Sequence, residues 1–370
     1  MKILILSESI AGSGHTRAAE NVAKGIRLHA PEAEIKIDSS LSHVSPTLEK
    51  WSSRLYMGAI RHAAPLWGWA YQRDREWSRM GKKTLNSFVA RKIAPYIEKE
   101  SPNIIISTHA FCLGGLAELK ERYGFRLGAA LTDYWVNPFW IHEKIDAYFV
   151  GAEYVKEKII RDFSLEAHKI HVTGIPIDPS FSQPVRREGI REKYSIPKDA
   201  CFVLISGGGM GILPYEEILE GLSQVDKSLF VAVLMGTNQQ AKKKVESHLA
   251  HAAFPHPILL LDYVSNIHEW MKSADLLIGK PGGLTVSEAL ACHLPILIYR
   301  PIPGQEERNS RFLLEEQVGM TAGNSEELKI QVNQFIEVRK QELAIQIERM
   351  KRLAKPASAE EVGKIMLNIT

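Results

Sequence analysis

Two series of short apolar runs, each interleaved with helix-like patterns, constrain the fold of this chain more than any other feature. Apolar runs of about four to eight residues are typical of parallel strands, which are buried on both faces and joined by crossover helices. After the first run, apolar residues recur with the spacing of one buried helical face, at Ala18, Ala19, Val22, Ala23 and Ile26. We therefore predict an α/β fold. The predicted strands are 2–7, 103–108, 126–132, 147–151 and 169–173 in the first series, and 201–206, 229–235, 258–264, 274–279 and 295–300 in the second.

The stretch between the two series, "GIPIDPSFSQPVRRE" at 174–188, is rich in proline and charge and is predicted to be a linker. A chain of 370 residues is also long for one hydrophobic core. We therefore expect a first domain over 1–178 and a second over 185–354, with a helix over 355–370 that packs back on the first. In parallel α/β sheets, ligands bind at the carboxyl ends of the strands. The sequence thus predicts two Rossmann-like domains facing a cleft.

Composition excludes several classes of protein. The net charge is only +3, with 46 basic and 43 acidic side chains, so we expect no nucleic-acid partner. Cys112, Cys201 and Cys292 lack metal-ligand or redox spacing and suit a reducing compartment. No apolar run has the length of a membrane span, and the first is too short for a signal peptide. We expect a cytoplasmic protein whose membrane contact, if any, is peripheral.

The loop after the first predicted strand, "AGSGHTRAA" at 11–19, combines glycine with histidine. It lacks the third glycine of the dinucleotide-binding fingerprint. It can be a plain turn capped by Thr16. A titratable side chain such as His15, next to Gly14 at the carboxyl end of a strand, better fits a general base or an anion contact.

Two glycine-rich loops in the second series can hold phosphate groups. "SGGGMG" at 206–211 follows a buried strand, and its glycines let the backbone of Gly208, Gly209 and Met210 approach a ligand closely, although a bare loop tip has the same composition. "GKPGGLTVSEAL" at 279–290 places glycines between a strand and a helix. The amides at that helix start favour an anion, and they belong to Gly282, Gly283, Leu284 and Thr285.

Carboxylates near the second loop point to sugar hydroxyls. Glu288 lies one turn beyond Thr285 on the same helix face, where it would repel phosphate but suit the hydroxyls of a ribose; the alternative is a carboxylate that complements the helix dipole. In "PIPGQEERNS" at 301–310, Gln305, Glu306 and Asn309 form a set suited to a hexose, although a solvated helix start has a similar composition.

Together these motifs resemble the GT-B glycosyltransferases of the monogalactosyldiacylglycerol synthase and processive diacylglycerol glucosyltransferase family. They are more distantly similar to the transferase that adds N-acetylglucosamine to lipid I. The resemblance also covers "STHAF", "LTDYWVNPFWIHEKIDAYFVGAEYV" and "VTGIPIDPSF", and its most specific part is 279–309. It implies a UDP-sugar donor, with Gly283, Leu284 and Thr285 at the diphosphate, Glu288 at the ribose, Tyr263 and Val264 at the uracil, and Gln305, Glu306 and Asn309 at the hexose.

On the acceptor side, the resemblance implies that His15 is the base and that His109 and Asp133 line the same site. One position departs from the family pattern: Asn137 stands where relatives usually have histidine near "WVNPFWIH". An amide cannot take a proton, so any base role at that position is lost and His15, assisted by Asp133, must deprotonate the acceptor.

The segment 51–83 is the compositional anomaly of the chain. It holds four of the seven tryptophans and seven basic against two acidic residues. Aromatic and basic side chains of this kind suit the headgroup region of an anionic membrane, with Trp67, Trp69, Arg73, Arg75 and Trp77 as candidate contacts. The alternatives are a helical hairpin whose tryptophans pack inward and an RNA-binding patch, although no recognised RNA-binding module is present.

The predicted reaction is inverting transfer of a hexose from a UDP-sugar to a lipid hydroxyl at the inner face of the cell membrane. The lipid we expect as the main acceptor is diacylglycerol. The helix dipole and amides at 282–285 would stabilise the leaving UDP. No Asp-x-Asp metal motif lies in a suitable loop, so no cofactor or metal is expected. Two alternatives remain: a UDP-N-acetylglucosamine epimerase, and a non-catalytic module that binds UDP-sugars.

Overall fold

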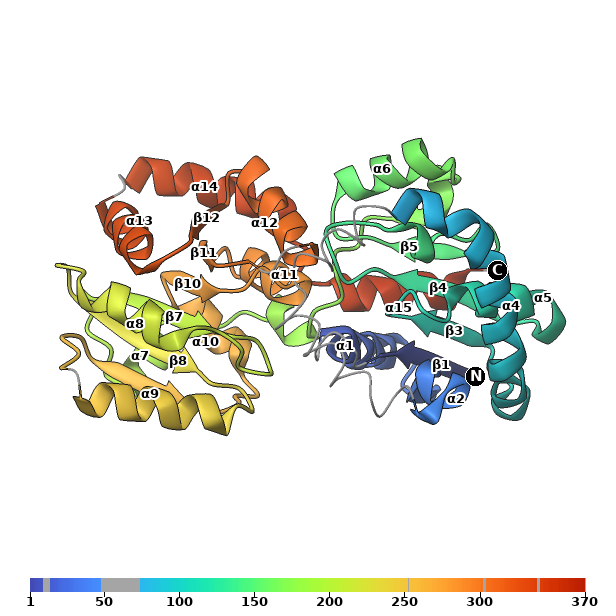
Figure 1. Ribbon diagram of the computed structural model, residues 1–370, viewed down its shortest axis with the longest axis horizontal. Helices are drawn as coiled ribbons and strands as arrows, with labels where there is room; N and C mark the ends of the chain where they lie inside the picture. Colours follow the sequence, from blue (N-terminus) through green and yellow to red (C-terminus); the bar gives the residue numbers. More distant parts are fainter. Residues whose placement is uncertain (9–13, 48–73, 252, 302–303, 338–339, 370) are drawn as a thin grey trace. The chain divides into compact units, whose positions relative to one another are not determined.

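The computed structural model describes residues 1–8, 14–47, 74–251, 253–301, 304–337 and 340–369, with the backbone alone at 74–83 and 340. The chain divides into two compact units. The first comprises Met1–Pro179, Pro303–Gln305 and Lys355–Thr370, and the second comprises Ser180–Ile302 and Glu306–Ala354. Each unit is an α/β structure with its own parallel sheet (Figure 1).

The first unit contains a six-stranded parallel sheet in the order β2-β1-β3-β4-β5-β6. Parallel pairing runs in register from Ile3↔Ile104 to Leu6↔Ser107 between β1 and β3, and β4 pairs with β3 from Ile104↔Arg126 onward. Its described strands are β1 (Lys2–Ser7), β2 (Glu34–Ser39), β3 (Ile104–Ser107), β4 (Arg126–Ala130), β5 (Ala147–Phe149) and β6 (Ile170–His171). Its described helices are α1 (Gly14–His29), α2 (Ser40–Val44), α4 (Asp74–Glu100), α5 (Leu113–Tyr123), α6 (Glu153–Phe163) and α15 (Ser358–Asn368), with 3₁₀ turns at Pro138–Trp140 and Ala167–Lys169. A further 3₁₀ turn, Pro179–Ser182, begins at the last residue before the second unit.

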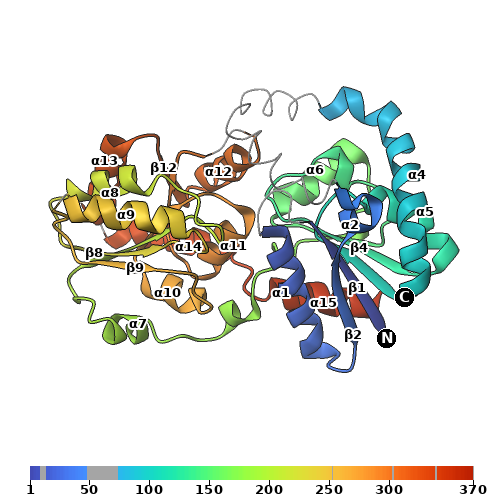
Figure 2. The same cartoon turned by 60° about the horizontal axis from the view of Figure 1, so that its bottom comes forward.

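Both faces of this sheet are buried, which explains its continuous apolar strands. Leu4 and Leu6 of β1 pack on the face covered by α4 and α5, whereas Ile3 and Ile5 pack on the opposite face with α1 and α15. Because successive side chains alternate between faces, a strand covered on both sides must be apolar at every position. The views in Figures 1 and 2 both show α1 and α15 side by side.

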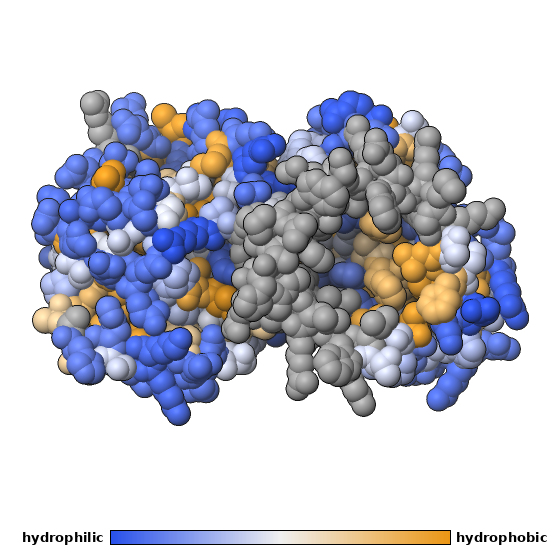
Figure 3. All heavy atoms as spheres, viewed as in Figure 1, coloured by the Kyte–Doolittle hydropathy of each residue, from blue (hydrophilic) through white to orange (hydrophobic). Residues whose placement is uncertain are grey.

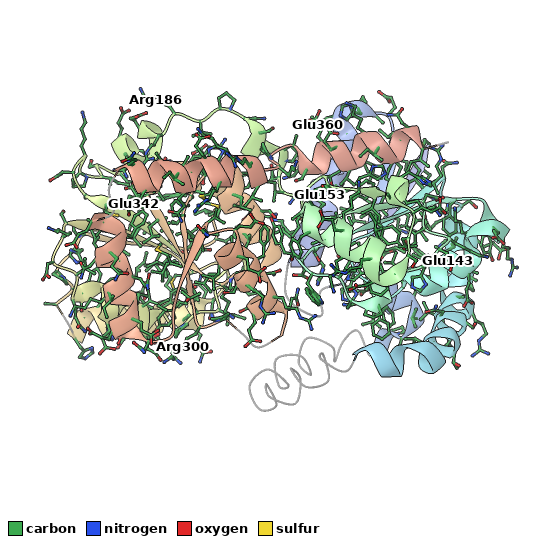
Figure 4. All side chains as sticks on the ribbon, turned by 90° about the horizontal axis from the view of Figure 1, so that it is seen from above. Glu143, Glu153, Arg186, Arg300, Glu342 and Glu360 are labelled. Carbon is green, nitrogen blue, oxygen red and sulfur yellow. The ribbon has the colours of Figure 1, made fainter. Side chains whose placement is uncertain are left out.

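The contact between α1 and α15 depends on two glycines. A Cβ at Gly25 would lie 2.1 Å from the carbonyl oxygen of Ala359, and one at Gly363 would lie 2.9 Å from the amide nitrogen of Ile26. At the end of α1, the Nε2 of His29 lies 3.2 Å from Oε1 of Glu360, which is labelled on α15 in Figure 4. The C-terminal helix is therefore an integral layer of the first unit.

The second unit contains another six-stranded parallel sheet, in the order β12-β11-β10-β7-β8-β9. Its central strands β7 and β8 are fully buried, apart from the half-buried first residue of β7, Cys201. Its described strands are β7 (Cys201–Ser206), β8 (Leu229–Leu234), β9 (Ile258–Leu261), β10 (Leu276–Gly279), β11 (Ile296–Tyr299) and β12 (Gly319–Ala322). Its described helices are α7 (Glu188–Lys193), α8 (Tyr215–Ser223), α9 (Gln239–His251), α10 (Ile267–Ser273), α11 (Gly283–Ala291), α12 (Gln305–Glu315), α13 (Ser325–Glu337) and α14 (Lys340–Leu353).

The two parallel sheets confirm the predicted fold class, and every predicted strand is present, several of them shorter than predicted. The sequence analysis missed β2 and β12, which are both edge strands. The predicted linker is not fully exposed, because the side chains of Ile175, Ile177 and Phe181 are buried. The Ile177 amide also donates a hydrogen bond to Oγ of Ser358 at 3.0 Å. Among the described helices, none combines the length and the apolar character needed to cross a membrane.

Candidate functional site

In the first unit, the candidate catalytic residues follow three neighbouring strands. His15 lies in the first turn of α1, the helix that follows β1, while His109 and Asp133 follow β3 and β4. Because β1, β3 and β4 are adjacent and parallel, their carboxyl ends meet at one edge of the sheet. The sheet order therefore brings the three predicted residues into one region.

The His15 side chain is fixed by contacts with two threonines. Its Nδ1 lies 3.0 Å from the carbonyl oxygen of Thr108 and 2.7 Å from Oγ1 of Thr132. The hydroxyl of Thr108 in turn donates to the carbonyl oxygen of His15 at 2.9 Å. Since a carbonyl oxygen can only accept, Nδ1 carries the ring proton. Nε2 is then the nitrogen with the free lone pair, as a general base requires.

Burial keeps His15 neutral. Its side chain is buried, and this desolvation lowers its pKa below the ordinary value of about 6.5. The charge of Asp133 and the hydrogen bond to Thr108 oppose that shift and raise the pKa. The neutral imidazole therefore predominates at neutral pH, and the Asp133 charge favours the imidazolium that forms when His15 takes a proton.

His109 packs against His15 edge to face, with ring centroids 4.7 Å apart. Its Nδ1 accepts a hydrogen bond from the Phe111 amide at 3.2 Å, and the hydroxyl of Ser107 donates to its carbonyl oxygen at 2.7 Å. Burial, followed by the charge that His15 carries when it is protonated, holds the pKa of His109 well below its ordinary value. His109 therefore stays neutral and borders His15 as an uncharged ring.

Three further positions from the sequence analysis are described in this unit. Gln305, which is grouped with the first unit, donates from Nε2 to Oδ2 of Asp133 at 2.5 Å. Among the described residues, no atom lies within 4 Å of a Cβ placed at Gly14. Asn137 accepts a hydrogen bond from the Phe139 amide at 3.0 Å and so caps the 3₁₀ turn that follows.

In the second unit, the predicted loops follow β7, β9, β10 and β11, whose carboxyl ends lie along one edge. The glycines after β7 form a tight turn. Gly211 has a φ of +55°, and a Cβ there would lie 1.9 Å from the carbonyl oxygen of Met235. A Cβ at Gly208 would instead meet nothing within 4 Å. Met210 is exposed and Gly209 is half-buried, so the tip of this turn is accessible to a ligand.

The start of α11 has the geometry of an anion site. Gly282 is the N-cap and has no side chain to bond the first amides of the helix. The first helical hydrogen bond runs from the Val286 amide to Gly282 at 2.9 Å, so the amides of Gly283, Leu284 and Thr285 cannot bond within the helix. Among the described atoms, a Cβ at Gly282 would meet the Thr285 hydroxyl alone, at 3.9 Å. Three amides and one hydroxyl are thus presented at the positive end of a helix.

The other residues predicted to bind the donor lie on α11, on α12 and in the segment after β9. Glu288 is half-buried one turn into α11, and Asn309 is fully buried on α12. Tyr263, after β9, is 48% exposed, and Val264 is half-buried. Oε1 of Glu306 lies 3.8 Å from the ammonium of Lys280, so the residue after β10 lies close to the first turn of α12.

The sequence analysis missed three residues at these sites: Thr108, Thr132 and Lys280. The two threonines directly precede His109 and Asp133 at the ends of β3 and β4, and that position was the only available signal. Lys280 directly follows β10 and precedes the glycines, where a cation would complement an anion.

Some predictions lie outside the described residues. Trp67, Trp69 and Arg73 belong to residues 48–73, which the structure does not describe. Arg75 and Trp77 belong to α4, where only their backbone is described. Among the described residues, no group of three or more His, Cys, Asp or Glu side chains is arranged to hold a metal ion.

Family models match both halves of the chain. Residues 15–177 match the monogalactosyldiacylglycerol (MGDG) synthase model, and residues 202–362 match the glycosyltransferase family 28 C-terminal domain. The chain is 27% identical to a processive diacylglycerol beta-glucosyltransferase of Bacillus licheniformis, over 90% of this chain and 86% of the relative. It is also 27% identical to the Bacillus anthracis protein of the same name, over 99% and 93%.

Solved structures share the fold at low sequence identity. MurG of Acinetobacter baumannii is 16% identical with a TM-score of 0.67 over 100% of both chains. Anabaena HepE in complex with UDP-glucose is 13% identical, with a TM-score of 0.57 over 99% of this chain and 98% of that one. The UDP-GlcNAc 2-epimerase of Neisseria meningitidis bound to UDP-GlcNAc is 12% identical, with a TM-score of 0.58 over 99% and 98%.

The two Rossmann-like units and the family matches define a glycosyltransferase of the GT-B class. Within that class, residues 15–177 belong to the monogalactosyldiacylglycerol synthase family and residues 202–362 to glycosyltransferase family 28.

Proposed function

We propose that this enzyme transfers a hexose from a UDP-sugar to the free hydroxyl of diacylglycerol, with inversion at the anomeric carbon. The hexose we expect to be preferred is glucose. The observation that carries the proposal is the state of His15. With its Nδ1–H held by the Thr108 carbonyl, its Nε2 offers a lone pair at the carboxyl edge of the first sheet. A neutral, oriented imidazole is what deprotonation of a weakly acidic hydroxyl requires.

In this proposal, the second unit binds the nucleotide of the donor. The amides of Gly283, Leu284 and Thr285 bind the diphosphate, and Glu288 binds the ribose hydroxyls. The tip of the turn after β7, formed by Gly208, Gly209 and Met210, closes over the nucleotide. Tyr263 and Val264 contact the uracil, and Gln305, Glu306 and Asn309 contact the hexose. The open space at Gly282 and the exposure of Tyr263 support this assignment.

The first unit, with its C-terminal helix, serves the acceptor. The acceptor oxygen attacks the anomeric carbon, the bond from that carbon to the diphosphate oxygen breaks, and UDP leaves with the electron pair. His15 takes the hydroxyl proton on Nε2, while Asp133 stabilises the resulting imidazolium and His109 supplies an uncharged wall. The amides and dipole of α11 stabilise the charge on the departing diphosphate, so no metal is needed.

We also propose that the first unit contacts an anionic membrane surface from the cytoplasmic side, through the segment 51–83 and the adjoining face of α4. On that face Leu85 and Phe88 are 39% and 43% exposed, next to the exposed Arg91 and Lys92. Figure 3 shows apolar surface, in orange, on the first unit at the right of the view. Apolar and basic side chains together favour binding to anionic lipid.

The reaction can be tested with the purified chain, vesicles containing diacylglycerol, and UDP-glucose, UDP-galactose or UDP-N-acetylglucosamine in separate incubations with and without EDTA. We expect a glycosylated diacylglycerol and free UDP by mass spectrometry, with UDP-glucose as the best donor and no effect of EDTA. Conversion of UDP-N-acetylglucosamine without an acceptor would indicate an epimerase. Binding of UDP with no turnover of any donor would indicate a non-catalytic module.

A further inference from the structure

The Nδ1 of His15 has two oxygen neighbours, although a single acceptor would fix its tautomer. The Thr108 carbonyl lies 3.0 Å away and the Thr132 hydroxyl oxygen 2.7 Å away. All three residues are buried; Thr108 is 0% and Thr132 4% exposed. Water is therefore largely excluded from Nδ1, and the protein oxygens take its place.

The direction of these hydrogen bonds follows from the carbonyl. If the Thr132 hydroxyl donated to Nδ1, the nitrogen lone pair and the Thr108 carbonyl oxygen would repel each other at 3.0 Å. With the proton on Nδ1, both oxygens accept from it in a three-centre hydrogen bond. That arrangement strengthens when Nε2 takes a second proton, because hydrogen bonds from a charged donor are stronger than those from a neutral one.

We infer that Thr132 is a positioning residue for the proposed transfer: its hydroxyl oxygen holds the His15 Nδ1–H together with the Thr108 carbonyl and stabilises the imidazolium formed during the reaction. This inference rests on the proposed role of His15 as the base. A neutral hydroxyl thus performs, at this site, the orienting task that a carboxylate performs beside a catalytic histidine in other enzymes.

The other groups that contact His15 determine which variant is a suitable control. His109 faces it from the loop after β3, and the Asp133 charge acts on it from the loop after β4. The hydroxyl of Thr108 contacts the backbone carbonyl of His15 and not its ring. Thr108→Val therefore removes a buried hydrogen bond near His15 and leaves the ring contact in place, which makes it a matched control for Thr132→Val.

The experiment measures the pKa of His15 and the reaction rate separately. The pKa and tautomer are read from the ring nitrogen resonances of ¹⁵N-histidine-labelled protein, assigned with His15→Gln. The wild type should show a protonated Nδ1. Thr132→Val should lower the pKa of His15, because one acceptor for the charged form is lost, and Thr132→Ser should restore it. Thr108→Val should leave this pKa at the wild-type value.

In the transfer assay, Thr132→Val should lower kcat by about 10- to 100-fold, the range for one hydrogen bond to a charged group, with KM for the UDP-sugar unchanged. The acid limb of its pH profile should move to lower pH, and Thr132→Ser should restore both properties. An unchanged His15 pKa in Thr132→Val, or an equal loss in Thr132→Ser, would overturn the inference. If Thr132→Val lowers the pKa of His15 as expected but His15→Gln retains full transfer, His15 is not the base and the proposed function is wrong. The hydrogen bond between Thr132 and His15 would still be confirmed.

Discussion

His15 is held at two points, by the hydrogen bonds of its Nδ1 and by the contact of its backbone carbonyl with Thr108. The sequence could single out His15 because it stands between a glycine loop and a helix at the end of the first predicted strand. It could not single out Thr108 and Thr132. A threonine before a histidine or an aspartate has no distinctive pattern, and its role depends on which strands are neighbours in the sheet.

The depressed pKa of His15 has a direct consequence for activity. A base must be unprotonated, so kcat/KM should fall only as the pH drops through the pKa of His15 in the free enzyme. Because burial lowers this pKa, we expect the acid limb below the ordinary value of about 6.5. A pH series of initial transfer rates measures it, and Asp133→Asn should move the limb to still lower pH because the carboxylate raises the pKa.

An acid limb clearly above pH 6.5, or a limb that moves upward in Asp133→Asn, would contradict this account of the base. The exposed His168 offers a control: His168→Ala should leave the profile unchanged.

At the scale of elements, sequence reasoning succeeded where strands are buried on both faces. The runs that became β1, β3, β7 and β8 are continuous because helices cover both sides of their sheets. It failed for β2 and β12, which lie at sheet edges and are partly exposed. An edge strand tolerates polar residues on its open side, as "EIKIDS" shows for β2, so no apolar run identifies it.

The packing of α15 on α1 gives a prediction for stability. Gly25→Ala would place a Cβ 2.1 Å from the Ala359 carbonyl oxygen, which forces the two helices apart. We expect a loss of about 1–3 kcal/mol in the free energy of unfolding, typical of overpacking, measured by urea denaturation. The control is Gly189→Ala in α7, where a Cβ meets nothing within 4 Å and a small gain is expected from helix propensity. An unchanged stability in Gly25→Ala would show that α15 does not pack closely on α1.

Across the whole molecule, one chain encodes two separate parallel sheets, to which we assign different proposed tasks. The glycine loops of the second unit and the histidine of the first could both be located from the sequence, because each follows a predicted strand. The ion pair between Lys280 and Glu306 could not be predicted from the sequence, because it depends on β10 and β11 being neighbours in the sheet.

The proposed membrane binding can be measured on the whole chain by vesicle flotation. We expect the wild type to float with vesicles containing anionic lipid and to remain unbound with neutral ones. Arg91→Glu/Lys92→Glu on the exposed face of α4 should weaken binding, since each basic side chain near an anionic surface contributes about 1 kcal/mol. Lys364→Glu on α15 is the control and should bind as the wild type does. Equal binding of all three proteins would exclude α4 from the membrane contact.

In the proposed mechanism, different parts of the chain bind the nucleotide and take the proton: the loops of the second unit bind UDP, and His15 of the first unit takes the acceptor proton. The most direct test compares UDP affinity and sugar transfer in His15→Ala. We predict UDP binding equal to the wild type by calorimetry, with transfer to diacylglycerol reduced by about 10²–10⁴-fold, the usual contribution of a general base. Retained transfer, or loss of UDP binding in this variant, would contradict the account.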